Sequence, residues 1–422
     1  MSETRRRCCY AATLLTATAA LLAGPVARPA TAASPAPLEL DGSGECTFPM
    51  KKQIEGTPWT LQRVLLDELW EDTKGEGVRV AVIDTGVDTA NPQLRTAVDA
   101  SAGLDLLKPE KGASGESRRG KTNGTVDEVG HGTKVAGIIA ARPRPGTGFV
   151  GLAPEATIIP IRQNDERNSG TANTMAAAIR HAIAKDAHVI NISQDTTQPL
   201  RPDSSLAQAV REALDRQIVV VASAGNDGLD GKLKNTYPAA FPGVLAVGAS
   251  DRNNERAAFS QAGEFLGVAA PGVDVVSTVP GGGQCVDNGT SFSAPYVAGV
   301  AALLRAKYPK WTPRQITARI EQTAERSVKG HDNYVGWGVV DPVRALTGEP
   351  DMKPIESPIP DPAPPRPPAP EPAFVALAET TQERSERLAT YVVGSAAVLV
   401  AVVAGTATVI RDSRRRPLSR RS

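Results

Sequence analysis

Short apolar runs alternate with stretches of helical periodicity through the middle of this 422-residue chain, and this alternation is the strongest constraint on its fold. The runs are rich in Val, Ile and Ala and cover residues 78–83, 156–161, 188–192, 218–222 and 244–249. The helical stretches cover residues 131–141, 171–185 and 204–216. Strands that alternate with helices form a mostly parallel sheet covered by helices on both faces, so we predict an α/β fold. Such a sheet carries its functional residues at the carboxyl ends of its strands.

The first 32 residues have the three-part layout of a secretory signal peptide. Arg5-Arg6-Arg7 precede an apolar stretch from Cys8 to Leu22, and Ala30-Thr31-Ala32 is similar to a cleavage site. The alternative is a single N-terminal anchor helix, but the apolar stretch is short for a bilayer and is ended by Gly24-Pro25. We therefore expect residues 1–32 to direct export and to be removed.

The C-terminal end carries a stronger membrane signal. Residues 391–410 contain no charged side chain and have the length that a spanning helix needs. An Arg-rich tail follows at residues 411–422. The positive-inside rule predicts a cytoplasmic tail and a single-pass protein of the cell membrane whose main domain is extracellular. A buried core helix is the alternative, but ten prolines between Pro354 and Pro372 separate this segment from the domain.

These signals divide the rest of the chain into an N-terminal extension (33–75), a main domain (76–346), a Pro-rich linker (347–378) and a polar, helical lead-in to the span (379–390). Thr57 and Pro58 are suited to begin a helix in the extension. We expect its apolar stripe to pack on the domain; the stripe consists of Leu61, Val64, Leu65 and Leu69. A remnant of an inhibitory propeptide is the alternative. The linker is expected to be an extended spacer rather than a ligand for an SH3-type domain.

Charge and cysteine content exclude some classes of protein. Lysine and arginine total 47 against 46 for aspartate and glutamate, so no basic field favours a nucleic-acid partner. Of four cysteines, Cys8 and Cys9 fall in the expected signal peptide. The other two, Cys46 and Cys285, are most simply a disulfide in an exported protein, with two free thiols as the alternative. There is no clear carboxylate-rich loop, so we predict no metal site and no cofactor, and calcium binding stays open.

Three short motifs place chemically active residues at the ends of predicted elements. Asp84-Thr85-Gly86 ends the first strand, His131-Gly132-Thr133 begins a helix, and Gly289–Pro295, which contains Ser291, begins another. Hydrolysis of an amide needs a nucleophile, a base that takes its proton and an anion that orients the base. A serine at a helix N-terminus also lies beside free backbone N–H groups, which can bind an oxyanion. Each motif alone is weak, because a turn, a buried histidine or a helix cap would explain it.

Together, in the order Asp84, His131 and Ser291, the motifs resemble those of the subtilases over roughly residues 76–345. The resemblance implies a subtilisin-like three-layer fold and a serine endopeptidase that cleaves protein or peptide substrates with these three catalytic residues. It also implies that Asn226, in Ala224-Gly225-Asn226, donates to the oxyanion. The alternative for Asn226 is the turn that Asn-Asp-Gly sequences favour.

The same resemblance implies that Ser193, Gln194 and Gly225 bind substrate. Subtilases often continue after this serine with leucine and paired glycines, whereas this chain has Gln194-Asp195-Thr196. This departure argues against the specificity of a broad-range digestive enzyme. The remaining histidines lack such a context and are expected to be structural or surface residues; they are His181, His188 and His331.

A narrower resemblance is to the mycosins, the membrane-anchored subtilases of type VII secretion systems. It rests on Pro58-Trp59 through Trp70, on Gly75-Glu76-Gly77-Val78, and on the linker, span and Arg-rich tail. It implies an actinobacterial envelope protein that cleaves few substrates and supports the secretion machinery. The alternative is a structural subunit that stabilises a membrane secretion complex, with catalysis secondary. The complete set of Asp84, His131, Asn226 and Ser291 argues against a pseudo-enzyme.

Overall fold

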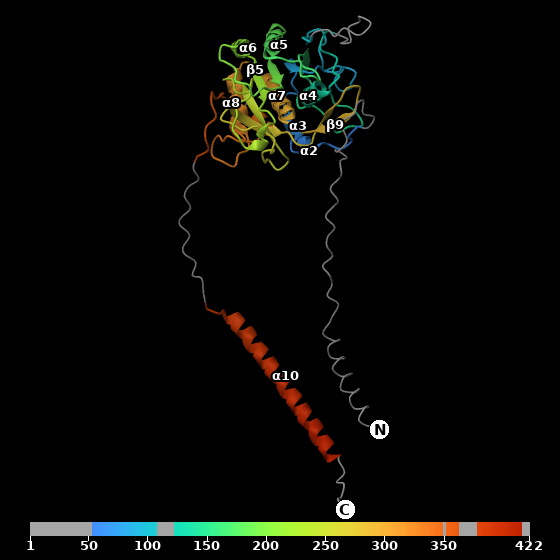
Figure 1. The fold of residues 1–422 in the computed structure, drawn as a ribbon, viewed down its shortest axis with the longest axis vertical. Coiled ribbons are helices and arrows are strands. Elements are labelled where there is room, and N and C mark those ends of the chain that lie inside the picture. The colour runs from blue at the N-terminus through green and yellow to red at the C-terminus, as the bar shows by residue number, and fades with distance from the viewer. Residues whose placement is uncertain (1–52, 108–121, 349–351, 363–377, 416–422) are drawn as a thin grey trace, which may run out of the picture. The chain divides into compact units, whose positions relative to one another are not determined.

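A computed structural model describes residues 53–107, 122–348, 352–362 and 378–415, which fall in two units that divide after Pro362 (Figure 1). Within the described part of the first unit, seven strands form one sheet in the order β2-β3-β1-β4-β5-β6-β7, and neighbouring strands are parallel. The strands are β1 (Arg79–Asp84), β2 (Leu104–Asp105), β3 (Thr157–Arg162), β4 (Val189–Ile192), β5 (Val219–Ser223), β6 (Leu245–Ser250) and β7 (Leu266–Pro271). A separate antiparallel hairpin consists of β8 (Val275–Thr278) and β9 (Gln284–Asp287).

The helices surround this sheet, except for the last one, which lies in the second unit. They are α2 (Trp59–Gln62), α3 (Leu66–Leu69), α4 (His131–Ala140), α5 (Ala172–Ala184), α6 (Ser205–Asp215), α7 (Thr290–Lys307), α8 (Pro313–Thr323), α9 (Pro342–Leu346) and α10 (Thr381–Arg414), with a short 3₁₀ turn η1 (Gly228–Asp230).

Both faces of the sheet are buried, because alternate side chains along a strand point to opposite faces. In β1, Val80 and Val82 belong to one core cluster together with residues of α4 and α7. Ala81 and Ile83 belong to a second cluster, with residues of α5 and α6. Burial on both sides explains why the strands are continuous apolar runs. The predicted α/β fold, a mostly parallel sheet between two layers of helices, is confirmed.

The N-terminal extension packs on the domain, but as two short helices rather than one. Its buried apolar side chains are Leu61, Val64 and Leu69. Leu65 is 57% exposed and lies in the turn between α2 and α3. The prediction that Thr57 caps a helix is wrong, because Pro58 occupies the N-cap and no side chain caps it. The Trp70 indole N–H donates to the Leu152 carbonyl at 2.8 Å, which fixes this segment to the domain.

The first part of the predicted linker also lies against the domain, along α8. The Arg314 guanidinium donates to Ser357 Oγ at 2.9 Å, and the Ile359 N–H donates to Gln322 Oε1 at 2.6 Å. The first unit therefore extends to Pro362, beyond the domain end that the sequence predicts at residue 346.

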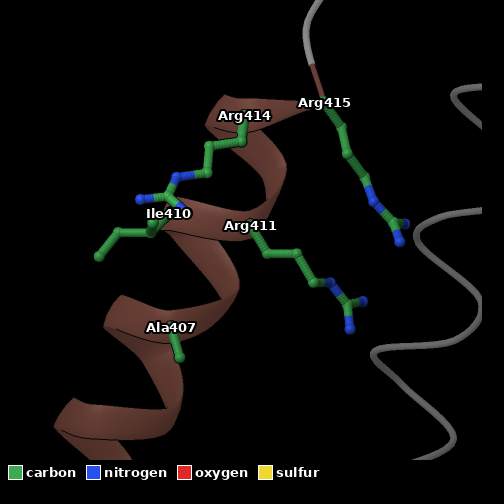
Figure 2. A pocket seen from close by; sticks show the side chains of 5 residues that line it. All are labelled: Ala407, Ile410, Arg411, Arg414 and Arg415. Carbon is green, nitrogen blue, oxygen red and sulfur yellow. The ribbon is translucent and has the colours of Figure 1, made fainter.

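The second unit contains α10, a continuous helix of 34 residues. Thr380 and Glu383 begin it with a capping box, in which each side chain accepts from the other residue's backbone N–H. Within the described residues, α10 is the one helix that is long and apolar enough to cross a membrane. The predicted lead-in, from Thr381 onward, and the predicted span thus lie on one helix. Arg411, Arg414 and Arg415 project from its C-terminal end (Figure 2).

Candidate active site

The three residues of the predicted catalytic motifs lie at element ends. Asp84 is the last residue of the central strand β1, His131 is the first residue of α4, and Ser291 lies in the first turn of α7. The helices α4 and α7 pack against each other, and a ring contact between residues of their first turns shows that these turns are neighbours. The His131 and Phe292 rings lie 5.4 Å apart, centroid to centroid. The fold therefore brings a carboxylate, an imidazole and a hydroxyl to one region.

A short hydrogen bond joins Asp84 and His131. The distance between His131 Nδ1 and Asp84 Oδ1 is 2.7 Å, and the Asp84 side chain is fully buried. The Thr85 N–H donates to the same carboxylate oxygen at 2.7 Å, which fixes its direction. Desolvation lowers the pKa of His131, but the charge and hydrogen bond of Asp84, helped by Asp127, outweigh it, so the pKa lies above its ordinary value. The anion therefore both orients the imidazole and favours its protonated form.

Asp127 is a buried carboxylate that joins the two elements carrying Asp84 and His131. It accepts hydrogen bonds from Thr85 Oγ1 at 2.8 Å and from the Gly130 N–H at 2.8 Å. It also accepts from Thr133, through the backbone N–H at 2.8 Å and through Oγ1 at 2.6 Å. Since the N-cap of α4 is Gly130 and has no side chain, Asp127 satisfies N–H groups at the start of this helix. Sequence analysis missed this residue; the signal was an aspartate shortly before a helix with a glycine N-cap.

Ser291 and Ser193 exchange hydrogen bonds. Ser291 Oγ donates to the Ser193 carbonyl at 3.1 Å, and Ser193 Oγ donates to the Ser291 carbonyl at 2.9 Å. The Ser291 hydroxyl thus points to Ser193, the residue after β4, rather than to His131 in this structure. A hydroxyl oxygen turns about one torsion, and contacts between nucleophile and base often tighten only when substrate binds.

The Asn226 amide is held by Thr290, the residue before Ser291. Asn226 Oδ1 accepts from the Thr290 N–H and from Thr290 Oγ1, both at 3.0 Å. With its oxygen occupied in this way, the amide presents its NH₂ group, and the residue is exposed to solvent. An exposed amide donor, positioned by the start of α7, is suited to receive a hydrogen-bond acceptor from a ligand.

The other residues predicted to bind substrate lie nearby, with different partners. The Gly225 N–H donates to Thr290 Oγ1 at 3.2 Å, so Gly225 is attached to the same turn as Ser291. The Gln194 side chain instead forms a hydrogen bond with the side chain of Gln163. Gln194 is thus held by a residue that follows β3, at the same edge of the sheet.

Several predicted residues lie away from these groups or outside the described residues. The three remaining histidines form hydrogen bonds with backbone groups: His181 with Ala102, His188 with Arg79 and His331 with Leu266. Cys285, on β9, is disulfide-bonded. Its predicted partner Cys46 lies outside the described residues, so this pairing stays a prediction. The pocket shown in Figure 2 is lined by residues at the C-terminal end of α10, and none of the predicted site residues line it.

Comparison with known proteins gives a consistent result. Residues 75–338 match Peptidase_S8, the subtilase family. Subtilisin E from Bacillus subtilis (strain 168) is 38% identical over 267 residues, which are 63% of this chain and 65% of subtilisin E, so the chain spans slightly less than two thirds of that relative.

Two solved structures share the fold. The MycP3 protease from the type VII (ESX-3) secretion system has a TM-score of 0.61 and 35% identity over 71% of this chain and 92% of its own. MycP1 with the N-terminal propeptide removed has a TM-score of 0.61 and 36% identity, and the match covers 70% of this chain and 98% of MycP1. These matches confirm both resemblances predicted from the motifs, and the chain belongs to the subtilase family.

Proposed function

We propose that this chain is a serine endopeptidase with Ser291 as nucleophile, His131 as general base and Asp84 as the orienting anion. The observation that carries the proposal is the 2.7 Å contact between the buried Asp84 carboxylate and His131, beside the helix turn that carries Ser291. Its similarity to subtilisin E and to the MycP3 protease supports the same chemistry.

In the first half of the reaction, Ser291 Oγ attacks the carbonyl carbon of the peptide bond while its proton passes to His131 Nε2. Asp84 stabilises the imidazolium that forms and keeps Nδ1 as the hydrogen-bonded donor. The carbonyl oxygen becomes an oxyanion, which accepts from Asn226 Nδ2 and from backbone N–H groups at the start of α7. Collapse of this intermediate breaks the C–N bond, and His131 gives its proton to the leaving amine.

In the second half, water attacks the acyl-enzyme. His131 takes a proton from the water, and the second oxyanion occupies the same position near Asn226. Ser291 Oγ then leaves and regains the proton from His131, which restores the enzyme and releases the carboxylate product.

We further propose that α10 anchors the protein in the cell membrane, with the catalytic unit on the extracellular side and the Arg-rich tail in the cytoplasm. The length and hydropathy of α10 and the arginines at its end support this topology. We also propose that the chain acts within a type VII secretion pathway and cleaves few substrates there; its similarity to the MycP3 protease from the type VII (ESX-3) secretion system supports the pathway.

A structural role in a membrane complex is the second candidate function. One similar structure is a MycP1 described as an essential component of the type VII (ESX-1) secretion system. If the role is structural, secretion should survive loss of catalysis but not loss of α10. Restoring a deletion strain with Ser291→Ala, and separately with a chain lacking residues 390–411, distinguishes the two roles.

The catalytic assignment is tested by labelling with a fluorophosphonate, which reacts with an activated serine. The wild-type protein should be labelled at Ser291, and Ser291→Ala should lose labelling and about 10⁶-fold in kcat, the size of this effect in a subtilisin. Ser205→Ala, on α6, is the matched control and should retain both. Undiminished peptide hydrolysis by Ser291→Ala would refute the assignment.

A further inference from the structure

The positions of Ser291 and Asn226 fix where the cleaved residue of a substrate must lie. β4 and β5 are neighbouring parallel strands, so the segments that follow them leave the sheet at the same edge. The first segment contains Ser193, which contacts Ser291, and the second contains Gly225 and Asn226. A substrate carbonyl between Ser291 Oγ and Asn226 Nδ2 would therefore lie beside these two segments.

The Asp195 carboxylate lies where these two segments face each other. A Cβ atom at position 225 would lie 2.9 Å from Asp195 Oδ2 and 3.2 Å from Thr236 Cγ2. Gly225 thus leaves room for the carboxylate, and its own φ of +99° also favours glycine. Thr196 and Tyr237 exchange backbone hydrogen bonds at 3.0 and 2.9 Å, which hold the Asp195 segment in place.

Among the described residues, no group compensates the charge of Asp195. In the part of the chain that the structure describes, no group donates a hydrogen bond to the Asp195 carboxylate and no cation pairs with it. Desolvation, followed by repulsion from Asp227, raises its pKa to about 6. Such a group is ionised at neutral pH and is stabilised by any cation that reaches it. The carboxylate is partly desolvated, but the residue as a whole keeps an exposed surface, so a ligand can reach it.

From this geometry we propose that Asp195 is a specificity-determining residue that selects substrates with Lys or Arg immediately before the cleaved bond. The ammonium or guanidinium group of that side chain would donate to the Asp195 carboxylate, which lies beside Gly225. Asp227, the residue after Asn226, adds a second negative charge near Asp195. This inference rests on the proposed peptidase function and adds the substrate class to it.

The experiment compares kcat/KM for peptides that differ only in the residue before the cleaved bond, using Lys, Arg, Gln and Leu, at a pH above 7. The wild-type protein should prefer Lys and Arg. Asp195→Asn should lower kcat/KM for the Lys and Arg peptides on the order of 10- to 100-fold, the effect of losing a hydrogen bond to a charged group. It should leave the Gln and Leu peptides nearly unchanged.

Three further variants sharpen the test. Asp195→Glu keeps the charge and should retain part of the preference, whereas Asp195→Lys should favour a Glu peptide instead. Asp215→Asn is the matched control: this exposed residue ends α6, which precedes β5 and therefore lies near the opposite edge of the sheet. The rate at which a fluorophosphonate labels Ser291 should be equal in all four variants, which shows that the fold and nucleophile are intact.

The outcomes separate this inference from the proposed function. The inference is overturned if the protein hydrolyses peptides without preferring Lys or Arg, or if Asp195→Asn retains that preference. In both cases the endopeptidase assignment stands. Absence of both cleavage in a peptide library and labelling of Ser291 overturns both.

Discussion

At the scale of single residues, the oxygen and the NH₂ group of the Asn226 amide have different roles. Its oxygen accepts two hydrogen bonds from Thr290, and its NH₂ group is left for a ligand. Two substitutions distinguish these roles. Asn226→Ala removes both ends, whereas Asn226→Asp keeps the acceptor for Thr290 and removes the donor.

We expect both substitutions to lower kcat by about 10²- to 10³-fold with little change in KM, because the donor acts on the oxyanion of the transition state. Asn226→Asp should be at least as damaging, because its negative charge repels the oxyanion. Steady-state kinetics on one peptide measure both variants. Near-normal kcat in Asn226→Asp would show that Asn226 only positions Thr290.

The raised pKa of His131 predicts how activity depends on pH. His131 must be neutral to accept the proton of Ser291, so kcat/KM should fall as the pH drops through its pKa. Because Asp84 favours the protonated form, this acid limb should lie above the ordinary histidine pKa of about 6.5. Asp84→Asn removes that charge, so it should move the limb to lower pH as well as slow the reaction. A pH–rate profile of both proteins tests this, and an acid limb at the same pH in both would contradict it.

At the scale of elements, Asp127 joins the end of β1 to the start of α4. Asp127→Asn replaces one carboxylate oxygen with an NH₂ group that faces the N–H of Gly130 or of Thr133. A buried donor left unpaired costs about 1–3 kcal/mol, so we expect the free energy of unfolding to fall by this amount. The kcat should fall too, since His131 is the first residue of α4. Urea denaturation measures the change, with the exposed Asp67→Asn as control; equal stability of the two variants would contradict the prediction.

The elements predicted best from the sequence are those whose burial on both faces produces a continuous apolar run. The runs that became β1 and β3 to β6 are apolar because both faces of the sheet are covered. β7 was missed because its sequence, Leu-Gly-Val-Ala-Ala-Pro, contains only one β-branched residue. β2 was missed because a two-residue strand has no periodicity. The turn that splits α2 from α3 was missed because the apolar spacing of Leu61, Val64 and Leu69 fits one helix equally well.

The residues of the candidate site were also predicted only in part. Asp84, His131 and Ser291 were predicted because each lies in a short motif at an element end. Asp127 and Asp195 were not, since their roles depend on contacts across the fold: Asp127 with Thr85, and Asp195 with Gly225. An isolated aspartate in a loop carries no local pattern that would distinguish it from a solvated one.

At the scale of the whole molecule, the segment that follows the domain divides into two parts. Residues 352–362 form hydrogen bonds along α8 and belong to the first unit. Residues 363–377 are rich in proline, a composition that favours an extended spacer. The tether between the first unit and α10 is therefore shorter than the Pro-rich composition alone predicts.

This arrangement predicts the result of digesting intact protoplasts with an added protease. If the domain is extracellular, cleavage within residues 363–377 should release a folded fragment that ends after Pro362 and still reacts with a fluorophosphonate at Ser291. A tag placed after the Arg-rich tail should survive with α10, because the positive-inside rule puts that end in the cytoplasm. Permeabilised protoplasts are the control, and in them the tag should be digested as well. Loss of the tag from intact protoplasts, with the domain protected, would reverse the proposed orientation, because the protease reaches only the side of the membrane to which it is added.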